Sequence, residues 1–226
     1  MFPSAGSSAK PCELEDCECM VVCVSFNELP VPVRSDLIRA LQKEWVLLAS
    51  PGTWWNASER LAIAGSARGV PRDGIPDVVA GAARRIYADI TTTSRGWVEE
   101  LTTSDLTMPA FIELVGIVSR LAAVDEFVAA LGGGLEELPQ PRPGDPSREP
   151  PPPARTGRGW VPMDGPASIT RALSLVPAEA AAQKEIHGPL YMSYEQMSDY
   201  GFRRTLDRAQ MELIAARVSA INECFY

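Results

Sequence analysis

Apolar residues recur at helical spacing near the start of this chain. In residues 34–50, RSDLIRALQKEWVLLAS, one apolar stripe has successive steps of one, three, four and three: Leu37, Ile38, Leu41, Trp45 and Leu48. Steps of three and four place side chains on one face of an α-helix. We therefore predict an amphipathic helix that ends before PGTWW. We expect Trp54 and Trp55 of that turn to pack in a core or an interface rather than to bind a ligand.

Two alanine-rich stretches follow, and both have the spacing of helices. They are residues 56–70, NASERLAIAGSARGV, and residues 75–90, IPDVVAGAARRIYADI. Asn56 or Ser58 is the candidate N-terminal cap of the first helix. Pro76 is tolerated in the first turn of the second.

A short helix is expected from Thr93 to Leu101, and a long one follows it in residues 107–134, TMPAFIELVGIVSRLAAVDEFVAALGGG. Pro109 lies near the start of the long helix and three glycines close it, which is the usual asymmetry of helix ends. Its interior is almost entirely apolar, so we predict that it lies at the centre of a core.

The composition changes sharply after the long helix. Residues 139–153, PQPRPGDPSREPPPP, contain eight of the chain's 20 prolines. Proline excludes regular helix and central strand, so this stretch indicates an extended, semi-rigid connector. Helical patterns return after Trp160 in AEAAAQKEIH and LYMSYEQMSDY, and finally in residues 207–221, DRAQMELIAARVSAI.

These patterns predict an all-α protein with two helical domains joined by a proline-rich linker. The expected divisions are a disordered extension over 1–28, a first domain over 29–134, the linker over 135–160 and a second domain over 161–226. A length of 226 residues is sufficient for one large domain or two small ones.

Charge narrows the classes of partner. The formal net charge is −8, and 22% of the residues are charged. An acidic chain lacks the basic surface that nucleic acids and anionic membranes require, so we expect neither as a partner. No apolar run approaches the ~20 residues of a membrane span, and the N-terminus lacks the apolar stretch of a signal peptide. We therefore expect a cytoplasmic protein.

Four of the five cysteines crowd into the N-terminal extension with the spacing C-x4-C-x-C-x3-C: Cys12, Cys17, Cys19 and Cys23. An odd total argues against a disulfide framework. The spacing contains no paired C-x2-C motif and has no histidine nearby, so we expect neither a metal site nor another bound cofactor.

The two halves of the chain look related. Sliding ERLAIAGSA onto ELIAARVSA by 153 positions pairs Glu59 with Glu212 and Ser66 with Ser219, and a shift of 152 works nearly as well. In either register the first half has no cysteine opposite Cys224. The first half continues for roughly sixty more residues after this helix, whereas the second half stops, so we expect an incomplete second domain.

The C-terminal stretch ELIAARVSAINECFY resembles the active-site entry of the carboxymuconolactone decarboxylase and alkyl hydroperoxidase D-like family. In that family's peroxidase branch eleven residues separate a glutamate from a C-x-x-C pair, and a histidine follows. Glu212 and Cys224 have this spacing. The first half resembles a domain of the same family through ERLAIAGSARGV and the long apolar helix.

The resemblance implies a helical, often oligomeric thiol peroxidase or disulfide oxidoreductase with an antioxidant role. Its implied partners are a peroxide or other small-molecule substrate, a protein or small dithiol reductant, and further copies of the intact chain. It also implies that Cys224 and Glu212 are catalytic residues, with Cys224 as the first, resolving thiol of the pair. The second cysteine and the relay histidine would lie beyond residue 226, so we expect a chain truncated within its motif and inactive or weakly active.

Simpler interpretations of the same residues stay open. A lone cysteine is usually a small buried apolar residue, and Glu212 can be a solvated residue about 18 Å from Cys224 along a straight helix. His187, the one histidine, is expected to end a helix rather than act as a base. The alternative functions are a non-catalytic scaffold or oligomerisation module, and a decarboxylase like carboxymuconolactone decarboxylase.

Overall fold

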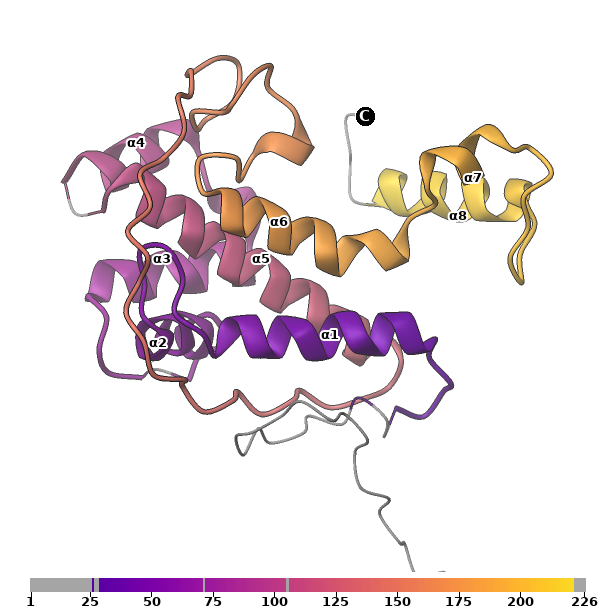
Figure 1. The fold of residues 1–226 in the computed structure, drawn as a ribbon, viewed down its shortest axis with the longest axis horizontal. Helices are drawn as coiled ribbons and strands as arrows, with labels where there is room; N and C mark the ends of the chain where they lie inside the picture. The colour runs from indigo at the N-terminus through magenta and orange to yellow at the C-terminus, as the bar shows by residue number, and fades with distance from the viewer. Residues whose placement is uncertain (1–25, 27–28, 71, 105, 222–226) are drawn as a thin grey trace, which may run out of the picture. The chain divides into compact units, whose positions relative to one another are not determined.

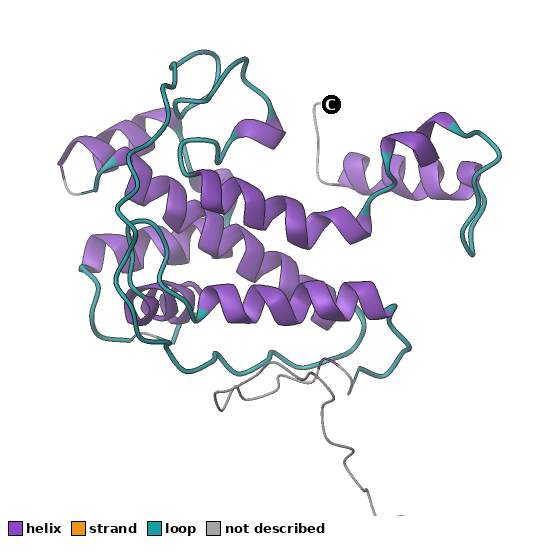
Figure 2. Cartoon of the chain, in the orientation of Figure 1, coloured by secondary structure: helices purple, strands orange, loops and turns teal. Residues whose placement is uncertain are grey.

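The computed structural model describes residue 26 and residues 29–70, 72–104 and 106–221. The regular elements of this part are α-helices and short 3-10 turns, and Figure 2 draws them with loops between them and no strand among the described residues. The described fold is therefore all-α, as predicted.

The five helices expected before the proline-rich segment all form close to their predicted bounds (Figure 1). They are α1 (Ser35–Leu48), α2 (Ala57–Ala67), α3 (Asp77–Ala88), α4 (Arg95–Ser104) and α5 (Met108–Ala130), with the short turn η2 (Ile90–Thr92) after α3.

Side-chain caps explain where two of these helices begin. The Asn56 side chain accepts a hydrogen bond from the backbone N–H of Glu59 at 2.9 Å, and the Glu59 carboxylate accepts one from the backbone N–H of Asn56 at 2.7 Å. This reciprocal pair is a capping box, and it selects Asn56 rather than Ser58 as the cap of α2. Thr107 caps α5 in a similar way by accepting a hydrogen bond from the backbone N–H of Ala110.

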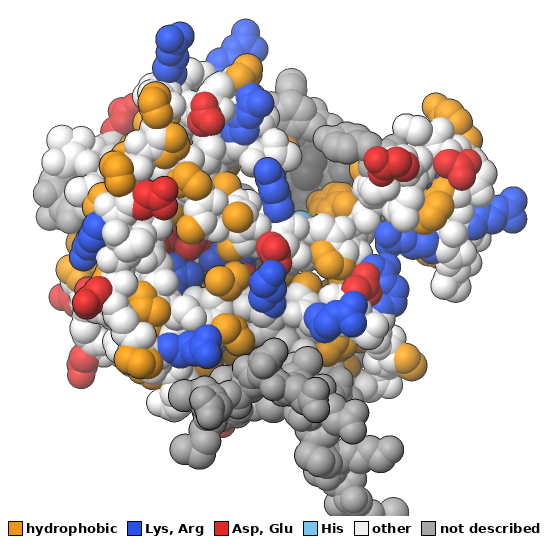
Figure 3. Space-filling model, viewed as in Figure 1, with side chains coloured by type: hydrophobic (Ala, Val, Ile, Leu, Met, Phe, Trp, Pro, Cys, Tyr) orange, Lys and Arg blue, Asp and Glu red, His pale blue; other side chains and the backbone are white. Residues whose placement is uncertain are grey.

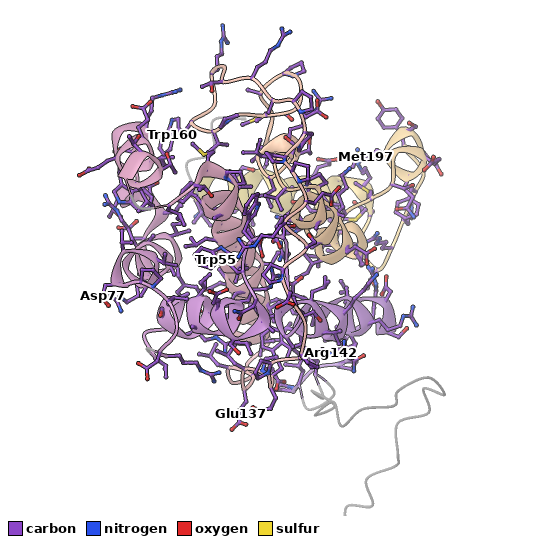
Figure 4. All side chains as sticks on the ribbon, turned by 60° about the vertical axis from the view of Figure 1, so that its left-hand side comes forward. Trp55, Asp77, Glu137, Arg142, Trp160 and Met197 are labelled. Carbon is purple, nitrogen blue, oxygen red and sulfur yellow. The ribbon has the colours of Figure 1, made fainter. Side chains whose placement is uncertain are left out.

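Helix α5 lies at the centre of the core, as its apolar sequence predicts. Its residues Leu114, Ile117 and Val118 are fully buried, and α2, α3 and α1 pack around it. Trp55 is also buried, and its indole N–H donates to the Ala110 carbonyl at 3.0 Å; Figure 4 places it in the interior of the bundle. The expectation that Trp55 packs in a core is confirmed.

The proline-rich segment is extended, as predicted, but it is also held against the helices. The backbone N–H groups of Arg142, Ser147 and Arg148 donate to carbonyls of residues 49–53, the loop between α1 and α2, at 2.8, 3.0 and 3.0 Å. Just before it, the Glu137 carbonyl accepts from the indole of Trp45 at 2.9 Å. The segment therefore fixes one loop of the bundle in addition to connecting two parts of the chain (Figure 1).

The remaining elements are helical, and the three α-helices among them lie in the stretches that the sequence indicates, whereas the short 3-10 turns were not predicted. The elements are η3 (Ile169–Arg171), α6 (Pro177–His187), η4 (Gly188–Leu190), α7 (Tyr194–Ser198) and α8 (Arg208–Ile221). His187 ends α6 and makes an edge-to-face contact with Tyr191.

The chain divides into two compact units, but not at the predicted linker. The first unit is Met1–Ile186 and the second is His187–Tyr226. The division falls later than residues 135–160 because residues 161–186 contribute buried side chains to the first unit: Met163, Leu173, Leu175, Val176, Ala182 and Ile186. Helix α6 therefore belongs to the same unit as α1–α5.

The start of α8 has a capping box like that of α2, which gives another alignment of the two halves of the apparent repeat. Asp207 accepts from the backbone N–H of Gln210 at 2.9 Å, and Gln210 Oε1 accepts from the backbone N–H of Asp207 at 3.0 Å. These contacts repeat those of Asn56 and Glu59 at a shift of 151, which places Leu61, and not Glu59, opposite Glu212. The starts of α2 and α8 are thus alike, while their side chains face different surroundings.

We predict that residues 29–186 unfold cooperatively at a higher temperature than residues 29–134. The shorter fragment retains α1–α5, but it loses the buried apolar residues of segment 161–186, of which each Val, Leu, Ile or Met contributes about 1.5–3 kcal/mol when fully buried. Circular dichroism melts of both fragments measure the difference. Equal melting temperatures would show that α6 contributes nothing to the core.

Candidate functional site

Five charged side chains are buried together in the first unit, on four different helices. Their exposed fractions are between 0% and 3%: Glu44 on α1, Arg60 on α2, Glu113 and Arg120 on α5, and Glu179 on α6. We call this set the buried charge cluster. Since Asp, Glu, Lys and Arg are almost never fully buried without a partner, the cluster is the least ordinary chemical feature of the described residues.

Glu113 is held by groups from α2 and from the loop before it. One carboxylate oxygen accepts from Arg60 Nη1 at 2.5 Å. The other accepts from the backbone N–H groups of Thr53 and Trp54, at 3.1 and 2.6 Å. Because the proline-rich segment is hydrogen-bonded to the same loop, it helps to fix the two N–H groups that bind Glu113.

Glu179 lies between the two guanidinium groups. Its Oε1 accepts from Arg60 Nη1 at 2.9 Å, and its Oε2 forms an ion pair with Arg120 Nη1 at 2.6 Å. Arg120 Nε donates in turn to Glu44 Oε1 at 2.8 Å. The contacts form one continuous chain from Glu44 through Arg120, Glu179 and Arg60 to Glu113.

Two glycines leave the space that these carboxylates occupy. A Cβ atom on Gly52 would overlap with the carboxylate of Glu113 and with Arg60, and a Cβ atom on Gly116 would overlap with the carboxylate of Glu179. Both positions therefore require glycine for close approach rather than for an unusual backbone angle.

Burial and the neighbouring arginines shift the pKa values of the three carboxyl groups in opposite directions. Burial raises the pKa of Glu44, with Arg120 opposing it, and burial also raises the pKa of Glu113, with Arg60 opposing it. Burial acts in the same direction on Glu179, but Arg60 and Arg120 outweigh it and hold the pKa of Glu179 below its usual value. Glu179 is thus the most firmly ionised carboxylate of the cluster.

Some polar atoms of the cluster are incompletely satisfied. Arg60 Nε and Arg120 Nη2 are buried and have no hydrogen-bond partner among the described residues. Such atoms are uncommon in protein interiors, and an internal water molecule is a common partner for them.

The sequence contains a signal for this cluster that the apolar patterns alone do not use. Glu113 and Arg120 interrupt the otherwise apolar interior of α5 seven residues apart, which places them on one face. A charged residue in a buried helix needs a partner, so two charges on one face of α5 indicate charged partners on neighbouring helices. Which residues those partners are is known only from the way α1, α2 and α6 pack against α5.

The predicted catalytic residues lie elsewhere. Glu212 is on α8 in the second unit, where its side chain is 56% exposed and accepts from Arg208 Nε at 2.6 Å. Cys224 lies outside the described residues, as do Cys12, Cys17, Cys19 and Cys23. The predicted pairing of Glu212 with Cys224 therefore stays a prediction.

Two further features bear on ligands. Within the described ranges no group of three or more His, Cys, Asp or Glu side chains is arranged to hold a metal ion. On the face drawn in Figure 3 acidic and basic side chains are interspersed rather than gathered by sign.

Of the helices in the described part, none combines the length and the apolar character needed to cross a bilayer. Comparisons with protein-family models, with curated proteins and with solved structures found no match to this chain.

We predict that Gly116→Ala lowers the free energy of unfolding by about 1–3 kcal/mol, because the new methyl group displaces the Glu179 carboxylate. Alanine favours a helix over glycine by about 1 kcal/mol, so helix propensity alone would raise the free energy of unfolding. A decrease therefore indicates steric overlap with Glu179. Urea denaturation measures the change. Gly81→Ala on α3 is the matched control: its Cβ atom meets nothing within 4 Å, and a small gain in stability is expected there.

We also predict that Arg120→Met lowers the free energy of unfolding by about 3–5 kcal/mol, because Glu44 loses its ion-pair partner and Glu179 keeps only Arg60. Lys43→Met is the comparison, since Lys43 and Glu185 form an exposed ion pair that also joins α1 to α6. That change should be within about 1 kcal/mol. A similar loss of stability in the two variants would contradict the prediction that the buried ion pairs matter more than the exposed one.

Proposed function

We propose that this chain is a thiol redox protein of the alkyl hydroperoxidase D-like type, a peroxidase or disulfide oxidoreductase in which Cys224 and Glu212 act together. The observation that carries the proposal is the spacing of eleven residues between Glu212 and Cys224 in ELIAARVSAINECFY. The helix expected over this stretch forms as α8, from Arg208 to Ile221.

The location of Glu212 is compatible with a role in proton transfer. Its carboxylate is 56% exposed on α8 and is paired with Arg208, so it is accessible to solvent and to groups that approach α8. Arg208 Nη1 also donates to the Met197 carbonyl at 3.1 Å, which fixes the guanidinium beside Glu212. A carboxylate held in this way can accept a proton from a thiol that approaches it.

The chemistry requires two thiols. A thiolate attacks the O–O bond of a peroxide, an alcohol or water leaves, and the sulfur becomes a sulfenic acid. A neighbouring thiol condenses with it to form a disulfide and water, and an external dithiol then reduces the disulfide. In a C-x-x-C pair that includes Cys224 as its first member, Cys224 would be the resolving thiol and the second cysteine would attack the peroxide. Cys224 alone is therefore expected to support little turnover.

We predict that appending a cysteine at the C-x-x-C spacing and a histidine a few residues later gives robust peroxide consumption with a dithiol reductant. Residues 1–226 alone should give a rate close to the uncatalysed one. Cys224→Ser in the extended chain should abolish catalytic turnover, because no disulfide can form. Glu212→Gln should lower the rate and alter its pH profile, while Arg217→Gln on the same helix is the control.

The result distinguishes the redox proposal from its alternative. An extended chain that consumes peroxide no faster than its Cys224→Ser variant would contradict a thiol peroxidase. The exposed apolar residues of α8 would then favour a scaffold or oligomerisation module: Leu213, Ile214, Val218 and Ile221 are 50% to 71% exposed.

A further inference from the structure

The buried charge cluster contains one carboxylate more than it has guanidinium groups. Glu44, Glu113 and Glu179 face Arg60 and Arg120, so the fully ionised cluster carries a net charge of −1 inside the core. An uncompensated buried charge is strongly unfavourable, and proteins usually avoid it by neutralising a group.

The excess charge arises from α6. Without Glu179, the remaining groups form two matched pairs, Glu44 with Arg120 and Glu113 with Arg60. The bundle α1–α5 is therefore balanced by itself. Docking of α6 inserts a third carboxylate between two guanidinium groups that already have partners.

The geometry indicates which carboxyl group accepts a proton in compensation. Glu113 receives three N–H donors, from Thr53, Trp54 and Arg60, and all three favour its ionised form. Among the described residues Glu44 receives one such bond, from Arg120 Nε to Oε1. A protonated Glu44 keeps that bond through Oε1, whereas Glu113 would have to give up part of its set.

We propose that docking of α6 onto the α1–α5 bundle takes up one proton, which is held on Glu44, so that the attachment of α6 weakens as the pH rises. The charged groups that act on Glu44 are Arg120 from α5, Glu179 from α6 and Arg60 from α2. On α1 itself the neighbouring Lys43 is exposed and is paired with Glu185 of α6.

The direction of the effect follows from linkage. Burial raises the pKa of Glu44 in the docked state, so its stabilising proton is fully present below the ordinary glutamate pKa and is lost as the pH rises through the raised value. The pKa of Glu179 is lowered, so its contribution is present above the ordinary value and is lost in strong acid. Attachment of α6 is therefore strongest in mild acid.

The consequence reaches the second unit of the chain. Helix α6 ends at His187, where the second unit begins. While α6 is docked, the residues directly before the second unit are held in the first unit. Release concerns α6 itself, because Met163, Leu173 and Val176, which precede it, are buried in the first unit and are not members of the cluster. The cluster would thus act as a pH-sensitive latch on α6, the helix that directly precedes the second unit.

Amide hydrogen exchange of the full chain tests the latch between about pH 5.5 and about pH 8.5, a range that lies above the ordinary glutamate pKa. Each rate is corrected for the intrinsic pH dependence of exchange. Protection of α6 relative to α5 should fall by up to about tenfold per pH unit within part of this range. Infrared spectra should show the carbonyl band of a protonated carboxylic acid that Glu44→Gln removes.

Three variants locate the proton. Glu44→Gln mimics the protonated side chain, so α6 should stay protected and the pH dependence should disappear. Glu185→Gln removes an exposed carboxylate from the same helix and should keep the pH dependence. A slope that persists in Glu44→Gln, that vanishes in Glu113→Gln, or that is absent from the unaltered chain would overturn the proposal.

Discussion

The need to pair buried charge constrains the first unit more than any other interaction. Removing an ion from water costs several kcal/mol, and only well-placed opposite charges and hydrogen bonds offset this penalty. Apolar contacts survive small shifts of one helix against another. The hydrogen bonds from Arg60 to Glu113 and Glu179, in contrast, are lost when the helices shift by more than a few tenths of an ångström. The cluster therefore fixes the register of α1, α2, α5 and α6.

This constraint extends to residues that carry no charge. Gly52 and Gly116 provide the space into which the carboxylates fit. The loop over residues 49–55 presents two backbone N–H groups to Glu113, and the proline-rich segment is hydrogen-bonded to the same loop. Since proline lacks an N–H group, the non-proline residues Arg142, Ser147 and Arg148 make these contacts. A segment with the composition of a linker thus supports the charged centre of the bundle.

The helices were predictable because their signals are local. The apolar stripe of α1, the cap at Asn56 and the span of α5 between Pro109 and the three glycines all follow from residues near one another in sequence. The attachment of α6 was not predictable in this way, because proline content shows that a segment is extended without showing what it packs against. The cluster likewise joins residues that are far apart in the sequence, from Glu44 to Glu179. Only Glu113 and Arg120 on α5 stand out locally, because they interrupt an apolar stretch.

Helices α2 and α8 show that local sequence signals predict a helix but not its burial. Each begins with a capping box, and each is rich in alanine and isoleucine or leucine, so the same local preferences favour both helices. In α2 nine of eleven residues are buried, whereas in α8 none is. The difference comes from tertiary partners: α2 has α3 and α5 beside it, and its Arg60 enters the charge cluster. The Glu212 carboxylate on α8 is therefore 56% exposed, whereas the carboxylates that meet Arg60 of α2 are buried in the core.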